Sequence, residues 1–334
     1  MIDRVQFPMS WHSPLMPGYG TFPAPFASTA LDYHQAARCS QSHVEEALAI
    51  GYRHLDTAFT YQNQDLVGAA IKVRGIARQE VFVTSKLHPN NNDYRAATSK
   101  IREAIQLIWG KDASGSAHYL DAFLLHYPGL RNPVAAWKAL IDARKQGLVR
   151  QVGVSNFEIR HLKKLREATG EYPAINQIEL HPYLYVEQKE LLEFCRRQDI
   201  AVEGYSPLAE GQVLDDPVLR TMAEDHGTSP ARIVLRWCMQ HGVRPIVGTR
   251  NRAHMQMNAE PYTFSLSDHQ LLLIDSLGNT KTVRVSLKWD WNPKSAPLGC
   301  SNFDSTLRRF LLRILRGVKE VIKMVSPGPG HGQN

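Results

Sequence analysis

Four side chains with complementary chemistry stand at the ends of three neighbouring predicted strands. Asp56 ends one strand and is followed by Tyr61, Lys86 ends the next strand, and His126 ends the third. A phenol, with a pKa of about 10, is a poor acid at neutral pH, but a neighbouring ammonium group stabilises the phenolate. A buried ammonium group needs a carboxylate partner, and a neutral histidine can hold a carbonyl oxygen through its N–H. The four residues together predict a proton donor for carbonyl reduction by hydride transfer.

The segments that must position these side chains alternate between strand and helix along the 334 residues. Each of eight short apolar or β-branched runs is followed by a helical pattern, which predicts an α/β fold, a (β/α)8 TIM barrel. The alternative is a doubly wound sheet, but no predicted helix closely follows Gly18 and Gly20, as a dinucleotide-binding turn would require. The eight predicted strands cover residues 16–21, 53–57, 81–87, 121–126, 151–155, 175–180, 201–206 and 245–249.

Three capping boxes mark predicted helix starts between these strands. Each has a serine followed three residues later by glutamate or glutamine, a pattern in which the two side chains and backbone N–H groups can satisfy each other. The pairs are Ser42 with Glu45, Ser155 with Glu158, and Ser267 with Gln270. Further helices are expected over 64–73, 94–109, 133–146, 187–198 and 229–241.

Six motifs, in order from about residue 14 to about residue 277, make the sequence resemble the aldo-keto reductase superfamily, of the short-loop aldose/aldehyde reductase type. The resemblance implies a (β/α)8 barrel that binds a nicotinamide cofactor without a Rossmann fold. It also implies that Tyr61 is the general acid, that Asp56 and Lys86 tune it, and that His126 orients the substrate. The motifs are GYRHLDTAFTYQN (51–63), VTSKL (83–87), YLDAFLLHYP (119–128), GVSNF (153–157), INQIELHPY (175–183) and GYSPL (204–208).

The same resemblance implies a set of cofactor-binding residues on the later strands. Three polar residues match the groups that hold the nicotinamide carboxamide, Tyr205 matches the aromatic ring on which the nicotinamide stacks, and two further residues match the segment beside the pyrophosphate. The carboxamide group comprises Ser155, Asn156 and Gln177, and the pyrophosphate segment contains Ser206 and Leu208.

Departures from the family pattern concern the 2′-phosphate of NADPH. The family usually ends strand eight with Pro-Lys-Ser/Thr and has an arginine soon after, whereas Gly248 stands at the lysine position here and His254 at the arginine position. Arg250 and Arg252 lie nearby and can substitute for these cations, so NADP(H) is the expected cofactor, with NAD(H) as the alternative. The candidate contacts on this segment are Thr249, Arg250, Arg252, His254 and Asn258. A further departure is Gln64, where the first motif usually has glutamate.

The substrate pocket is expected to be open and shallow. Phe22, His88 and Tyr127 stand where many family members carry tryptophan, and with His126 they are the predicted substrate-binding residues. The loops after His126 and Tyr205 are both short, which favours an open pocket. The expected substrate is a small-molecule aldehyde or ketone, whose identity the sequence does not specify.

The charge of the chain is concentrated at its C-terminal end. Residues 279–334 hold 10 Lys/Arg and 3 Asp/Glu, an excess equal to the +7 of the whole chain. The barrel, expected over 1–278, is thus neutral, which argues against a nucleic-acid partner. Within the basic extension, 305–325 predicts an amphipathic helix for a subunit, the barrel itself or an anionic membrane surface. The Pro/Gly-rich end, 326–334, is expected to be disordered.

Two further expectations follow from composition. No run approaches the ~18 apolar residues of a transmembrane helix and no signal peptide is apparent, so a cytoplasmic protein is predicted. The four cysteines form no CxxC or zinc spacing, so no metal is expected. The alternative to an enzyme is a cofactor-binding barrel that acts as a redox sensor or a structural module. The intact set of Asp56, Tyr61, Lys86 and His126 favours the enzyme, because a non-enzymatic barrel has no physical reason to keep all four.

Overall fold

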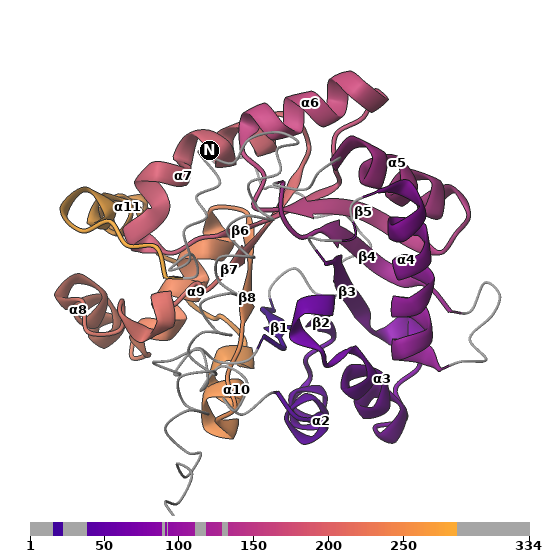
Figure 1. Cartoon of the computed structure of the whole chain (residues 1–334). Coiled ribbons are helices and arrows are strands. Elements are labelled where there is room, and N and C mark those ends of the chain that lie inside the picture. Colours follow the sequence, from indigo (N-terminus) through magenta and orange to yellow (C-terminus); the bar gives the residue numbers. More distant parts are fainter. Residues whose placement is uncertain are drawn as a thin grey trace, which may run out of the picture.

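The computed structural model describes residues 16–22, 39–88, 91, 93–110, 118–128 and 133–285. In this part of the chain eight parallel strands close into a barrel in the order β1 to β8, which confirms the predicted (β/α)8 TIM barrel (Figure 1). The predicted helix at 305–325 and the Pro/Gly-rich end lie outside the described residues. The strands are β1 (Gly18–Gly20), β2 (His54–Asp56), β3 (Phe82–Leu87), β4 (Leu120–Leu125), β5 (Val149–Ser155), β6 (Ile175–Glu179), β7 (Ala201–Tyr205) and β8 (Val243–Val247).

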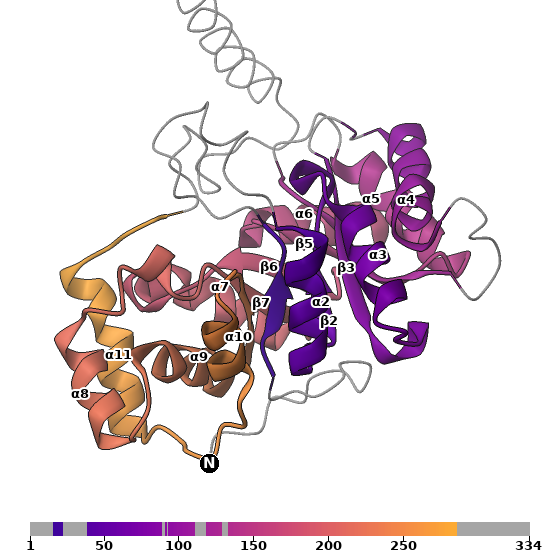
Figure 2. The same cartoon turned by 90° about the horizontal axis from the view of Figure 1, so that it is seen from below.

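Helices surround the barrel and cover the outer faces of its strands (Figures 1 and 2). Strands β3 and β4 are buried along their whole length, because helices cover one face and the barrel core fills the other. The helices are α2 (Gln41–Ile50), α3 (Gln64–Val73), α4 (Tyr94–Trp109), α5 (Pro133–Lys145), α6 (Ile159–Thr169), α7 (Tyr185–Arg197), α8 (Pro217–Asp225), α9 (Pro230–Gln240), α10 (Arg252–Ala259) and α11 (Asp268–Thr280).

The helix starts test the predicted capping boxes. The third is confirmed, because Ser267 accepts a hydrogen bond from the backbone of Gln270, whose side chain accepts one from Ser267 N. The first is wrong: α2 begins after Ser40, whose partner is His43 rather than a glutamate.

The second predicted box is also wrong, because Ser155 is the last residue of β5 and α6 begins only after Glu158. Its serine faces the barrel mouth instead of capping a helix. Helices α8 and α10 were not among the predicted helices, and Asp216 and Asn251 cap them by accepting backbone N–H bonds.

The close packing of α3 against α4 depends on one glycine. A Cβ atom at Gly68 would lie 1.8 Å from the carbonyl oxygen of Ile108, far inside any real contact. Glycine is therefore required where the two helices touch, and their apolar faces join the main core between helices and strands.

The interior of the barrel contains both apolar and polar side chains. A small cluster of buried apolar residues is separate from the main core: Phe82, Ala122, Leu124 and Ile175. Beside these apolar residues, Gln177 pairs in register with Glu203, and Glu203 pairs with Arg244 on the next strand. TIM barrels carry their active sites at the C-terminal ends of the strands, where polar side chains are therefore of interest.

Within the described residues no helix is long and apolar enough to span a membrane. The same residues contain no group of three or more His, Cys, Asp or Glu side chains arranged to hold a metal ion.

Candidate active site

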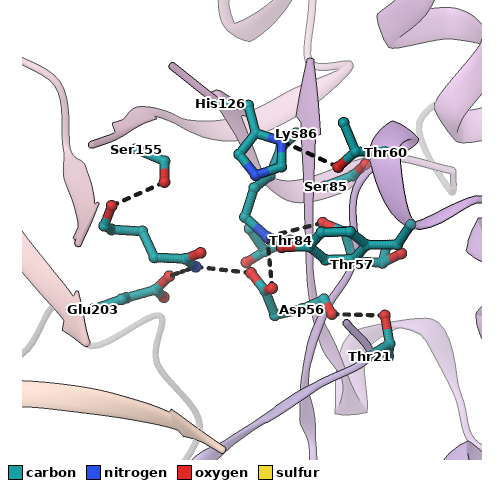
Figure 3. Close-up of polar contacts among 12 residues, drawn as sticks. Thr21, Asp56, Thr57, Thr60, Thr84, Ser85, Lys86, His126, Ser155 and Glu203 are labelled. Atoms are coloured by element: carbon teal, nitrogen blue, oxygen red, sulfur yellow. Dashed lines mark hydrogen bonds and ion pairs between the residues drawn. The ribbon is translucent and has the colours of Figure 1, made fainter. Parts of the chain in front are cut away.

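The ammonium group of Lys86 is the centre of the polar cluster at the barrel mouth (Figure 3). Its Nζ donates to Asp56 Oδ1 at 2.5 Å, to the Thr57 carbonyl oxygen at 3.1 Å and to Tyr61 OH at 3.2 Å. The Lys86 side chain is fully buried, and burial lowers its pKa, whereas the carboxylates of Asp56 and Glu203 oppose that shift. One buried cation thus contacts a carboxylate and a phenol.

Tyr61 is positioned by a short 3-10 helix, η1 (Phe59–Tyr61), that follows β2. Asn63 holds the ends of this turn: its Oδ1 accepts from Thr57 Oγ1 at 2.8 Å, and its Nδ2 donates to the Thr21 carbonyl at 2.8 Å. Gln62, between Tyr61 and Asn63, has a φ of 53°, a left-handed conformation that ends the helix. Hydrogen bonds therefore join the turn to the residues that follow β1 and β2, and the Tyr61 hydroxyl lies next to Lys86 Nζ.

His126 lies on the other side of Tyr61, immediately after β4. The two rings meet edge to face with centroids 5.8 Å apart. Burial, and then the charges of Lys86 and His88, hold the pKa of His126 well below its usual range, so the imidazole is neutral at neutral pH. The hydroxyl of Thr60 lies 3.4 Å from Nδ1. If that hydroxyl donates to Nδ1, the proton is on Nε2.

The predicted carboxamide-binding residues form one connected group at the ends of β5, β6 and β7. Tyr205 OH donates to Asn156 Oδ1 at 2.7 Å, and Asn156 Nδ2 donates to Ser155 Oγ at 3.0 Å and to the His126 carbonyl at 3.1 Å. Ser155 Oγ in turn donates to the Gln177 carbonyl at 2.9 Å. Asn156 reaches all of these partners from a left-handed conformation, with a φ of 66°.

The pyrophosphate candidates follow β7 directly. Ser206 also has a left-handed φ, 49°, and Leu208 is half-buried against the core at the start of a short 3-10 helix, η4 (Ala209–Gly211). Both residues thus follow Tyr205, the last residue of β7, within three positions.

The structure separates the candidates for the 2′-phosphate. Thr249 lies at the end of β8, where its carbonyl accepts a hydrogen bond from Tyr19 OH at 2.9 Å. Arg250 follows it and is exposed; burial raises the pKa of Cys39, and the charge of Arg250 partly opposes that shift. Arg252 lies on α10 and forms an ion pair with Glu46 at 2.8 Å.

The two remaining candidates on α10 differ in exposure. His254 is exposed in its first turn, whereas the Asn258 side chain is buried in the helix's inner face. Of the five candidates on this segment, Thr249 and Arg250 are nearest in sequence to the end of β8, where the barrel opens.

Three predicted substrate-binding residues border Tyr61 and His126. Phe22 is 44% exposed and meets the Tyr61 ring edge to face at 5.1 Å. Tyr127 stacks on the His126 ring at 4.6 Å. His88 is close enough for its charge to lower the pKa of His126. Aromatic and imidazole rings therefore form the wall around the phenol and imidazole expected to meet substrate.

Comparison with known proteins agrees with this geometry. The family model described as "Aldo/keto reductase family" matches residues 18–279. The chain belongs to the aldo/keto reductase family. This confirms the predicted resemblance.

Among its aldo/keto reductase relatives is a glyoxal reductase of Bacillus subtilis, 40% identical over 72% of this chain and 84% of the relative. A methylglyoxal reductase of Yersinia pestis is 37% identical over 70% of this chain and 82% of the relative. Among solved structures, a Bombyx mori aldo-keto reductase in complex with NADP has a TM-score of 0.71 at 29% identity, covering 86% of this chain and 95% of that one.

One departure from the aldo/keto reductase pattern has a structural outcome. Gln64 is buried at the start of α3, and its Oε1 accepts a hydrogen bond from Ser85 Oγ at 2.5 Å. Ser85 and Lys86 are neighbours on β3, and their side chains point to opposite faces of the strand. The amide therefore sits behind the active site, between strand and helix.

Sequence reasoning missed several residues that complete the site of this aldo/keto reductase. Asn63 and Thr60 were not singled out, although both lie within the turn that carries Tyr61. Glu203 was missed too. Its Oε2 accepts a hydrogen bond from Gln177 Nε2 at 2.7 Å, and the same nitrogen donates to Asp56 Oδ2. The sequence did contain a signal for Glu203: it is a glutamate inside the apolar strand run 201–206, and a buried charge needs a partner.

Proposed function

We propose that this protein reduces a carbonyl group to an alcohol with NADP(H), and that Tyr61 supplies the proton. The observation that carries the proposal is the Lys86 ammonium group, which donates to Asp56 Oδ1 at 2.5 Å and to Tyr61 OH at 3.2 Å. A cation in contact with a phenol stabilises the phenolate that remains after proton transfer. The buried carboxylate keeps that cation charged at a site where burial alone favours the neutral amine.

Each residue of the cluster has a defined task in the reaction. The bound nicotinamide supplies the hydride that adds to the carbonyl carbon. Tyr61 gives its phenolic proton to the carbonyl oxygen, so the C=O bond becomes an alcohol, and Lys86 holds the resulting phenolate. His126, neutral, donates from Nε2 to the same oxygen and orients it.

The polar groups at the ends of β5, β6 and β7 fit a nicotinamide. Gln177 gives its Nε2 hydrogens to Asp56 Oδ2 at 2.8 Å and Glu203 Oε2 at 2.7 Å, so its carbonyl oxygen is the group left for an amide N–H. Ser155 and Asn156 stand beside it, and the half-buried Tyr205 ring offers a flat apolar face for stacking. The family's carboxamide and ring contacts can all be made from these positions.

Small aldehydes and ketones are the proposed substrates, with dicarbonyl compounds the first to test because two relatives bear the names glyoxal and methylglyoxal reductase. Oxidation of NADPH is followed spectrophotometrically against a panel of aldehydes, ketones, dicarbonyls and quinones. Turnover with at least one carbonyl class supports the proposal. Tight NADPH binding with no turnover on any member would favour the redox-sensor or structural alternative instead.

Arg250 is the proposed contact for the 2′-phosphate. Arg250→Ala is expected to weaken NADPH binding by about 1–3 kcal/mol, the size of a charge-assisted hydrogen bond, and to leave NADH binding almost unchanged. Arg252→Ala is the matched control, because its exposed guanidinium is already paired with Glu46. Fluorescence titration of the wild type and the two variants with both nucleotides measures the six affinities. A wild-type protein that binds NADH and NADPH equally would contradict the choice of NADP(H).

For the basic extension, we propose that 305–325 form an amphipathic helix that packs on protein, either this barrel or a second subunit. The chain reaches Val285 in contact with the barrel, where Val285 N donates to Glu179 Oε1 at 2.7 Å and Arg284 pairs with Glu187 at 2.9 Å. Residues 279–334 as a unit separate from the barrel, and a cytoplasmic location, stay predictions.

A chain ending at Val285 tests this packing, because it keeps both contacts with the barrel. We expect it to lose thermal stability or to change oligomeric state relative to the full chain, and neither chain to sediment with lipid vesicles. Full-length protein that binds anionic but not neutral vesicles, more weakly in high salt, would show that the helix lies on a membrane instead.

A further inference from the structure

A second set of charged groups lies inside the barrel, directly beneath the catalytic cluster. His54, Glu203 and Arg244 are each at most 4% exposed. Bulky apolar residues dominate most TIM-barrel interiors, and a buried charge is costly unless it is paired and hydrogen-bonded. Because a buried apolar cluster that includes Phe82, the register partner of His54, shows that apolar packing was available nearby, the charged layer needs a functional explanation.

The hydrogen bonds of this layer run in a defined direction. Arg244 Nη1 lies 3.3 Å from His54 Nδ1, and because a guanidinium can only donate, Nδ1 is the acceptor. Burial, with the charges of Arg244 and Lys86, lowers the pKa of His54 well below its usual value, so the ring is neutral and its proton is on Nε2. That nitrogen is 3.2 Å from Thr84 Oγ1 and 3.4 Å from Glu203 Oε1. The hydrogen bond of Nε2 is therefore to Thr84, and Glu203 Oε1, which accepts no hydrogen bond from the described residues, lies beside the His54 ring.

Glu203 is connected to the catalytic cluster through one amide group. Gln177 Nε2 lies 2.7 Å from Glu203 Oε2 and 2.8 Å from Asp56 Oδ2, and an amide nitrogen has two hydrogens to give. Asp56 in turn accepts from Lys86, which donates to Tyr61. The contacts therefore continue from Arg244 to the phenol, with Glu203 as the link between the two layers (Figure 3 shows the upper half).

The charges that face Glu203 come from three strands. Asp56 and the neutral His54 lie on β2, and Lys86 lies on β3. Arg244, the register partner of Glu203, lies on β8. Burial and then Asp56 raise the pKa of Glu203 to about 7, although Arg244 and Lys86 pull it down. Glu203 is therefore charged above about pH 7, and its carboxylate acts on Lys86 by raising the lysine's pKa.

We propose that Glu203 is a positioning residue of the active site: it fixes the Gln177 amide, and its negative charge, balanced by Arg244, sets how readily Tyr61 gives up its proton. The inference rests on the proposed function, because it concerns Tyr61 as proton donor and Gln177 as cofactor contact. Because both Nε2 hydrogens of Gln177 go to the carboxylates of Asp56 and Glu203, the side-chain oxygen of Gln177 is the part of the amide left for the cofactor.

Glu203→Gln separates charge from shape, since the two side chains are nearly isosteric. Without the carboxylate, Lys86 and Arg244 are less compensated and the Tyr61 phenolate is stabilised. The pH at which Tyr61 ionises is then expected to fall by about one unit. Arg244→Met removes the opposite charge and is expected to raise that pH, and Glu203→Asp, which keeps the charge, should stay near wild type.

The ionisation is measured by ¹³C NMR of protein labelled at tyrosine Cζ, without nucleotide, with Tyr61 assigned by its loss in Tyr61→Phe. This measurement does not depend on turnover. A protein that reduces no carbonyl would contradict the proposed function, but the effect of Glu203 on the ionisation of Tyr61 could still be measured. A folded Glu203→Gln protein with the wild-type Tyr61 titration overturns the inference. If Glu203→Gln does not fold, Arg244→Met decides: an unchanged or lowered ionisation pH rejects the inference.

The same variants give a second readout in the enzyme assay. Because reduction requires the protonated phenol, the high-pH limb of the kcat profile should move to lower pH in Glu203→Gln, in the same direction as the NMR titration. A merely structural role would lower kcat at every pH without moving the limb. NADPH binding should also weaken in this variant, because the amide of Gln177 loses one of its two charged acceptors.

Discussion

Tyr61→Phe is expected to lower carbonyl reduction by about 10²–10⁴-fold while leaving nucleotide binding intact. The substitution removes the hydroxyl that receives the Lys86 hydrogen bond at 3.2 Å and keeps the ring that packs between Phe22 and His126. The measurement is kcat for NADPH-dependent reduction, with the NADPH affinity determined by fluorescence titration on the same preparation.

The matched control for this variant is Tyr94→Phe. Tyr94 OH donates to Asp142 on the outer helices, so its loss removes a tyrosine hydroxyl of similar chemistry far from Lys86. Turnover of the control should stay near wild type. Near-normal turnover in Tyr61→Phe would show that another group protonates the carbonyl oxygen.

Lys86→Met is expected to cause a comparable loss of activity and a large loss of stability. The change leaves the Asp56 carboxylate, 2% exposed, with the neutral Gln177 amide and without its cation. Removing one partner of a buried ion pair costs about 3–5 kcal/mol. Urea unfolding of both proteins measures the difference in the free energy of unfolding.

The control for stability is Lys100→Met, which breaks a surface ion pair with Glu103 at 2.7 Å. An exposed pair of this kind contributes about 0–1 kcal/mol, so this variant should unfold close to wild type. Equal destabilisation by the two lysine substitutions would mean that the Asp56–Lys86 pair is not held as a buried pair in solution.

The barrel could be predicted from the sequence because its strands are continuous apolar runs. Each of the eight was found to within about two residues, since a buried parallel strand differs from its polar flanks on both faces. Capping boxes were less reliable. The spacing of Ser155 and Glu158 is that of a helix start, yet Ser155 ends β5, because tertiary hydrogen bonding to the Gln177 carbonyl takes its hydroxyl.

The contacts among the candidate catalytic residues could be anticipated for a related reason: residue types that need one another occur at successive strand ends. The contacts across the barrel could not, since His54 and Glu203 are 149 positions apart and no local pattern relates them. Arg252 shows the same limit, because its partner Glu46 is on α2. Strand patterns predict which side chains point inward, and only the closed barrel shows which of them meet.

Transfer of label from the cofactor tests the central claim most directly. Wild-type protein is given a reducible aldehyde and NADPH carrying deuterium at C4 of the nicotinamide, in separate samples labelled on each face. Mass spectrometry then locates the label. The account predicts one deuterium on the carbinol carbon of the alcohol, from one face only, because the Tyr205 ring covers the other. Product without deuterium from either sample, or label from both faces equally, would contradict hydride transfer at this site.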